Sequence, residues 1–259
     1  MISLTRALML KGGGVVSFVG AGGKTSLMFS LAKILSAGGG CVLTTTTTKI
    51  HMPEKDQSDR VIITRNISKV LKAAEKIRSG SAHFTAAGNK LDTTPLKLNG
   101  FEPDFIDALW NGGEFRYILV EADGAAGKPL KVPAAHEPVI PESSKWVVGV
   151  AGLNGVGTPL DETHVFRPDR FAEITGAQYG KPVSEASVAR SILDPRGIMK
   201  GCPSRAVKIA FLNRMDTNPR IRSGQKIAAI LKKENNRFLN RVVMGNAQES
   251  RPVVAYHDL

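Results

Sequence analysis

The sequence has little cysteine and no long apolar segment. Cys41 and Cys202 are the two cysteines among 259 residues, and this is too few for a disulfide framework or a cysteine-rich zinc site. The apolar stretch at the N-terminus is too short to span a membrane and lacks a cleavage-type ending, and no run of about 18 apolar residues follows it. We therefore expect a cytoplasmic protein in a reducing compartment, with no membrane partner.

Sequence signals for nucleic-acid binding are also missing, although the chain is basic. Lys and Arg number 35 against 23 Asp and Glu, which gives a formal net charge of +12 and favours anionic partners. The charges are scattered, with no basic run beyond short groups such as Lys232-Lys233, and no RNP-like or zinc-finger motif is present. We expect a nucleotide, an anionic cofactor or an acidic protein as the partner, and no nucleic acid.

What the sequence does have is an alternation of strand-like and helix-like segments. Apolar runs predict strands at 15–19, 41–45, 61–64, 82–87, 117–120, 146–150, 207–212 and 242–244. Helical spacing predicts helices at 25–36, 67–78, 104–110, 169–175, 184–193 and 223–232. This order predicts a single α/β domain over residues 1–259, with a more helical insertion around 160–200. Its fold class is a three-layer sandwich with a mostly parallel sheet, like that of P-loop NTPases.

A glycine-rich loop follows the first predicted strand. A phosphate loop needs glycines whose backbone N–H groups point at phosphate oxygens, a lysine for the β and γ phosphates, and a hydroxyl for Mg²⁺. The usual first glycine is replaced by Phe18, so the loop has the shorter G-x-G-G-K-T form, which resembles that of Mur-type ATP-dependent ligases. The residues predicted to bind the nucleotide here are Gly20, Gly22, Gly23, Lys24, Thr25 and Ser26.

Two carboxylates follow the apolar strand at 117–120, where P-loop proteins place a metal partner. Alternation along the strand puts Glu121 and Asp123 on one face. We interpret both as candidate catalytic residues, one holding Mg²⁺ or its waters and the other orienting a nucleophile, and the sequence leaves open which does which. The predicted metal ligands are Thr25, Asp123 and Thr46, the last from the five threonines that leave the second strand toward the same sheet edge.

The segment Asn213-Arg-Met-Asp216 directly follows the strand at 207–212 and is similar to the N-K-x-D guanine-reading motif of GTPases. In that motif the aspartate accepts hydrogen bonds from guanine, and an arginine in place of the lysine can also stack on a purine. Asn213 and Asp216 are therefore predicted to contact the base. A polar strand-to-helix turn with no ligand explains the segment equally well, so both GTP and ATP stay open as the cofactor.

The 22-residue block 120–141, together with 18–25 and 43–50, resembles the YqeC-like family of selenium-dependent hydroxylase accessory proteins. The resemblance implies a bacterial accessory factor whose partners are a molybdenum hydroxylase or its maturation factors. Within the block, Lys128 is predicted to reach an anionic ligand, and His136 is a candidate acid or base. A structural histidine in a proline-rich loop is the alternative for His136. Where the family pattern has a histidine before Arg-Pro, this chain has Phe166.

Three functions are compatible with these signals. The preferred one is a nucleotide-binding accessory protein, a Mg²⁺-dependent NTP hydrolase or switch that assists maturation of a selenium-dependent molybdenum hydroxylase. The second is an ATP-dependent ligase or kinase, which the Mur-like loop favours. The third is a module that binds a nucleotide or a molybdopterin nucleotide without turnover. The Glu-x-Asp pattern favours turnover only mildly, so whether the chain is an enzyme stays open.

Overall fold

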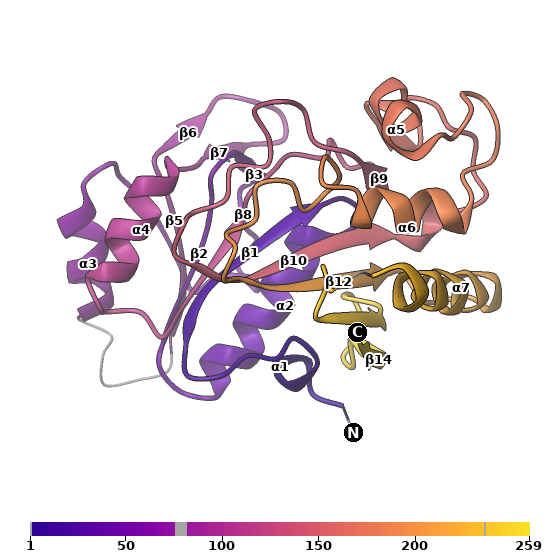
Figure 1. Ribbon diagram of the computed structural model, residues 1–259. Helices are drawn as coiled ribbons and strands as arrows, with labels where there is room; N and C mark the ends of the chain where they lie inside the picture. The colour runs from indigo at the N-terminus through magenta and orange to yellow at the C-terminus, as the bar shows by residue number, and fades with distance from the viewer. Residues whose placement is uncertain (1, 76–81, 236) are drawn as a thin grey trace.

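A nine-stranded sheet forms the centre of the computed structural model, which describes residues 2–75, 82–235 and 237–259 (Figure 1). Its strand order is β14-β13-β12-β10-β1-β8-β2-β5-β4, and neighbours run parallel except at the β13–β14 edge. The strands are β1 (Gly14–Gly20), β2 (Cys41–Thr46), β4 (Arg60–Ile63), β5 (Ala82–Ala87), β8 (Tyr117–Glu121), β10 (Ser144–Gly152), β12 (Val207–Asn213), β13 (Arg241–Gly245) and β14 (Val253–Asp258).

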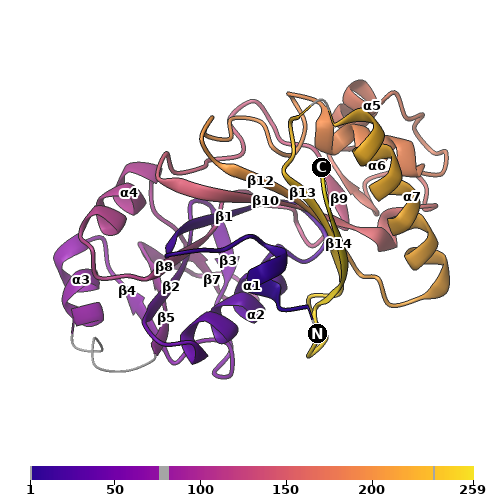
Figure 2. The ribbon, with the colours of Figure 1, turned by 60° about the horizontal axis from the view of Figure 1, so that its bottom comes forward.

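Helices cover both faces of this sheet, because its central strands are apolar on both sides. From β1, Val16 and Phe18 pack with one group of helices, whereas Val15 and Val19 pack with the other. The first group is α1 (Leu4–Ala7) and α2 (Lys24–Ala37). The second group is α3 (Ile67–Glu75), α4 (Pro103–Asn111), α5 (Pro168–Thr175), α6 (Glu185–Leu193) and α7 (Asn218–Glu234). Figure 2 shows α1 and α2 on one side of the sheet and α5 to α7 clustered on the other. The predicted three-layer α/β sandwich is confirmed.

Several short elements were not predicted. A three-stranded antiparallel sheet has the order β3 (Lys49–His51), β7 (Lys97–Asn99), β6 (Asn89–Leu91), and β9 (Leu130–Lys131) pairs in parallel with β11 (Val165–Phe166). The 3₁₀ turn η1 spans Leu153–Gly155. Strands of two or three residues are too short to show an alternating pattern. The predicted helix at 67–78 ends at Glu75, and the rest of that prediction lies outside the described residues.

The connections place a crevice at the end of β1. The chain leaves β1 for β2 on one side, inserts β8 between them, and later adds β10 on the other side of β1. Ligands of open α/β sheets bind at such switch points, outside the carboxyl ends of the strands. In register, Glu121 at the end of β8 lies beside Phe18 of β1 and Thr46 of β2. No helix in the described part of the chain is long and apolar enough to cross a membrane.

Candidate functional site

The loop between β1 and α2 has a conformation that requires glycine. Gly22 and Gly23 have φ values of 83° and 117°, in the left-handed region. A Cβ on Gly22 would lie 2.4 Å from the Cα of Gly152, and one on Gly23 would lie 2.3 Å from the side-chain nitrogen of Asn213. Helix α2 begins directly afterwards at Lys24. The unpaired N–H groups and partial positive charge of its first turn therefore face the loop, as an anion site needs.

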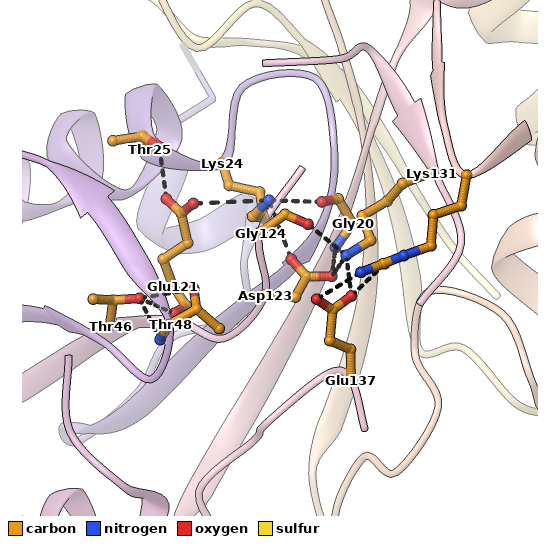
Figure 3. Close-up of polar contacts among 11 residues, drawn as sticks. Gly20, Lys24, Thr25, Thr46, Thr48, Glu121, Asp123, Gly124, Lys131 and Glu137 are labelled. Atoms are coloured by element: carbon orange, nitrogen blue, oxygen red, sulfur yellow. Dashed lines mark hydrogen bonds and ion pairs between the residues drawn. The ribbon is translucent and has the colours of Figure 1, made fainter. Parts of the chain in front are cut away.

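The lysine of the loop is folded inward and almost fully buried. Its ammonium donates to the carbonyl of Gly20 at 2.6 Å and lies 3.1 Å from Asp123 Oδ1 and 3.8 Å from Glu121 Oε1 (Figure 3). Burial alone would lower the pKa of Lys24, but the carboxylates of Asp123 and Glu121 outweigh it and raise the pKa above its ordinary 10.5. The side chain is therefore a permanent cation directly beneath the loop.

The two carboxylates after β8 have different surroundings. Glu121 lines the cleft beside the loop, and Thr25 donates its hydroxyl to Glu121 Oε2 at 2.6 Å. Burial raises the pKa of Glu121, and the opposing charge of Lys24 and the hydrogen bond from Thr25 do not cancel this effect. Asp123 is completely buried, and its Oδ2 accepts from the N–H of Gly20 at 3.0 Å. Glu121 thus faces the cleft, whereas Asp123 holds the loop from behind.

Asp123 is also the second member of a chain of alternating buried charges. Lys131 lies 2.9 Å from Asp123 Oδ2 and 2.8 Å from Glu137 Oε2. Glu137 in turn accepts two hydrogen bonds from Arg167, at 2.6 and 3.1 Å. Burial alone would raise the pKa of Glu137, but hydrogen bonds from Arg167 and Lys131 lower it to about 2. The Lys24–Asp123–Lys131–Glu137–Arg167 series of ion pairs, hereafter the charge chain, joins the loop between β1 and α2 to the start of α5.

A cleft of about 670 Å³ opens above the loop. Its lining includes seven of the residues predicted from the sequence: Gly22, Gly23, Lys24, Thr25, Ser26, Glu121 and Lys128. It also includes residues that the sequence analysis did not single out, among them Lys49, His51, Lys97 and Asn154. The first three lie on β3 and β7, and these strands are too short to be recognised from the sequence. The one signal available was the i, i+2 spacing of Lys49 and His51, which places both side chains on one face of a strand.

Other predicted site residues lie outside the cleft lining. Gly20 uses its N–H and its carbonyl to hold Asp123 and Lys24. Thr46 is buried, with its hydroxyl donating to the carbonyl of Glu121 at 2.7 Å. His136 is exposed, and its ring lies 4.0 Å from Glu137 Oε1. These placements give Gly20 and Thr46 supporting positions around the loop and put His136 on the surface.

The residues of the segment that resembles a guanine-reading motif also differ in whether they line the cleft. Asn213 is buried, donates to the carbonyl of Gly22 at 2.7 Å and accepts from the N–H of Ala247 at 2.9 Å, so it fastens the loop to the sheet. Asp216 is outside the cleft lining and pairs with Arg220 at 2.5 Å. Arg214 does line the cleft, with a left-handed φ of 68°.

Mg²⁺ is compatible with the donors that face the cleft. A Mg²⁺ ion in nucleotide sites keeps several waters and phosphate oxygens and needs only one or two protein oxygens. The hydroxyl of Thr25 and the carboxylate of Glu121 are already side by side there. Among the described residues there is no group of three His, Cys, Asp or Glu side chains that could hold a metal without a substrate. The two protein oxygens therefore suit a metal ion whose remaining ligands are phosphate oxygens and water.

Replacing Glu137 by glutamine is expected to lower stability in a pH-dependent way. The folded pKa of about 2 is below the ordinary 4.5, so the carboxylate stabilises the fold above pH 4.5 and loses this effect as pH falls toward 2. Glu137→Gln should therefore unfold more easily at neutral pH and show a flatter stability profile across that acid range. Urea titrations at several pH values measure this, with Glu173→Gln, at an exposed ion pair, as the control. If the free energy of unfolding depended on pH in the same way for Glu137→Gln and the wild type, the lowered pKa of Glu137 would be contradicted.

Comparison with known proteins identifies relatives that share this region. A family model described as YqeC protein matches residues 16–169, a span that contains the glycine-rich loop, both carboxylates and the whole charge chain. The protein YqeC of Escherichia coli (strain K12) is 37% identical over 200 residues, which cover 77% of this chain and 75% of that protein. The chain therefore belongs to the YqeC family.

Proposed function

We propose that the chain binds a nucleoside triphosphate together with Mg²⁺ in the cleft above Gly22 and Gly23. The observation that carries the proposal is the meeting of Lys24, Thr25 and Glu121 at the first turn of α2. One cationic, one hydroxyl and one carboxylate group lie there beside free helix N–H groups, which is the donor set of a nucleotide phosphate site. The scattered excess of basic residues is consistent with an anionic ligand.

Each group has a distinct part in this proposal. The N–H groups of Gly23 and of the α2 first turn bind the phosphate oxygens, and Lys24 moves its ammonium from the carboxylates to the β and γ phosphates. Thr25 and Glu121 hold Mg²⁺, which neutralises phosphate charge when it is bound. Asp123 stays enclosed, with Lys131 balancing its charge at 2.9 Å when Lys24 turns away. Asp123 is thus a positioning residue, and Glu121 is the carboxylate that meets the ligand.

We infer that turnover of the nucleotide serves as a switch or energy source during maturation of a selenium-dependent molybdenum hydroxylase. This role is supported by what the resemblance to accessory proteins of selenium-dependent hydroxylases implies and by the carboxylate of Glu121 at the proposed phosphate site. Recovery of a molybdenum hydroxylase or one of its maturation factors with the tagged protein, identified by mass spectrometry, tests it. Co-purification that depends on the nucleotide supports a switch, and a client set without any such protein contradicts the role.

Lys24→Met is expected to weaken binding of a Mg²⁺–nucleoside triphosphate by about tenfold or more, because it removes a charge-assisted contact to two phosphates. Isothermal titration calorimetry with a non-hydrolysable triphosphate measures the change. Lys33→Met, at an exposed position of the same helix, is the matched control and should bind like the wild type. Thermal unfolding of both variants checks that the fold is kept. Unchanged affinity in folded Lys24→Met protein would remove the basis of the phosphate site.

Glu121→Gln is expected to abolish the gain in nucleotide affinity that Mg²⁺ gives the wild type. Because burial raises the pKa of Glu121, its carboxylate takes up a proton at a higher pH than an ordinary glutamate. The Mg²⁺-dependent part of the affinity should accordingly fall in the wild type as pH is lowered, and should be absent at every pH in the variant. Calorimetry with and without Mg²⁺ across a pH series decides this. An undiminished Mg²⁺ effect in Glu121→Gln would assign the metal to other groups.

Base selection between GTP and ATP is proposed to depend on the Asp216–Arg220 ion pair. A free Asp216 carboxylate accepts from the N–H groups of guanine and faces the acceptor N1 of adenine unfavourably. Arg220 engages that carboxylate in an ion pair. Arg220→Ala should therefore increase the preference for GTP over ATP, and Asp216→Ala should remove it. Competition binding of the two nucleotides to both variants measures the preference, and tighter ATP binding by the wild type would favour the ligase-like function instead.

A further inference from the structure

The cleft has a second basic wall, formed by the two-stranded part of the small sheet. β3 and β7 pair antiparallel, with His51 opposite Lys97 and Ile50 opposite Leu98. Since successive side chains of a strand point to opposite faces, Lys49, His51 and Lys97 share one face. Ile50 and Leu98 share the other face, where they are buried. All three basic residues line the same cleft as the phosphate loop.

These three side chains have no acidic partner in the described part of the chain. No carboxylate there lies within 4.0 Å of the side-chain nitrogens of Lys49, His51 or Lys97. The two acidic residues in the cleft lining are already engaged, Glu121 with Thr25 and Lys24, and Glu137 with Lys131 and Arg167. Unpaired cations that converge on a cleft attract anions strongly, because the low-dielectric walls focus their field.

This basic wall, the loop and Glu121 line one and the same cleft. Figure 1 shows β3, β6 and β7 together beyond the end of the β1–β8 pair. Lys24 and the first turn of α2 supply one set of donors to this cleft, and the basic side chains of β3 and β7 supply a separate set.

We propose that Lys49, His51 and Lys97 form a second anion subsite, which holds the phosphate group of a small-molecule substrate next to the bound triphosphate. The proposal rests on the proposed nucleotide site, whose phosphates have donors of their own in the loop. A dianionic phosphate monoester suits two lysine cations and an imidazole that converge on one cleft better than a singly charged carboxylate does. A second substrate in this position distinguishes a kinase or ligase from a simple hydrolase, which requires only water.

The test is a titration of inorganic phosphate into protein saturated with Mg²⁺ and a non-hydrolysable triphosphate. Binding is monitored by ³¹P NMR and by the amide chemical shifts of the protein. Phosphate should bind without displacing the nucleotide, and acetate should bind more weakly. Lys49→Gln/Lys97→Gln should weaken phosphate binding by about tenfold or more and leave nucleotide affinity within about twofold. The matched control is Lys55→Gln/Lys90→Gln. It removes the same charge from exposed lysines outside the cleft lining, and Lys90 pairs with Leu98 on the opposite face of the small sheet.

Three results would overturn the subsite. Phosphate could compete with the triphosphate, the double variant could bind phosphate as the wild type does, or it could lose nucleotide affinity to the same extent as phosphate affinity. The last result would mean that the β3–β7 cations hold the triphosphate itself. Phosphate titration of nucleotide-free Lys24→Met protein separates this proposal from the first one. Retained binding there that is lost in Lys24→Met/Lys49→Gln/Lys97→Gln supports the subsite even if no nucleotide binds, and its absence contradicts the subsite.

Discussion

The buried ion pair between Lys24 and Asp123 is the constraint on which the site depends. Taking a charge out of water is unfavourable by several kcal/mol unless a partner of opposite sign accompanies it. Each charge in the charge chain is accompanied in this way. Asp123 also pairs with Lys131, and Glu137 pairs with both Lys131 and Arg167. Removing any inner member takes one of two ionic partners away from a buried neighbour. The charge chain therefore ties the loop, β9 and the start of α5 to one another.

The same arrangement bears on the phosphate site that we propose. Lys24 is held at 2.6 Å from the carbonyl of Gly20, so in that proposal its ammonium exchanges its present partners for phosphate oxygens. Asp123 keeps Lys131 and the N–H of Gly20 after that exchange. Preorganised donors that need no reordering contribute more to binding than donors that must be assembled.

Sequence reasoning found the elements whose pattern is local. The strand, loop and helix around Lys24 were predicted because a run of β-branched residues indicates a buried strand, glycines indicate a tight loop, and apolar residues at helical spacing indicate the helix that follows in a βαβ unit. Strand alternation predicted that Glu121 and Asp123 lie on one face, but β8 ends at Glu121, so alternation does not extend to Asp123 and the two carboxylates have different surroundings. The charge chain joins residues far apart in the sequence, such as Lys24 and Arg167. The left-handed backbone of Arg167, with φ of 63°, is likewise imposed by tertiary contacts and has no sequence signature.

Hydrogen–deuterium exchange with and without a Mg²⁺-bound non-hydrolysable triphosphate tests the central claim most directly. Slower exchange is predicted at Gly23 and the first turn of α2, because the ligand takes up N–H groups there that have no helical partner. Exchange at the β14 edge of the sheet should stay unchanged. Unchanged exchange in the loop at saturating nucleotide, or protection confined to another surface, would contradict a phosphate site at the end of β1.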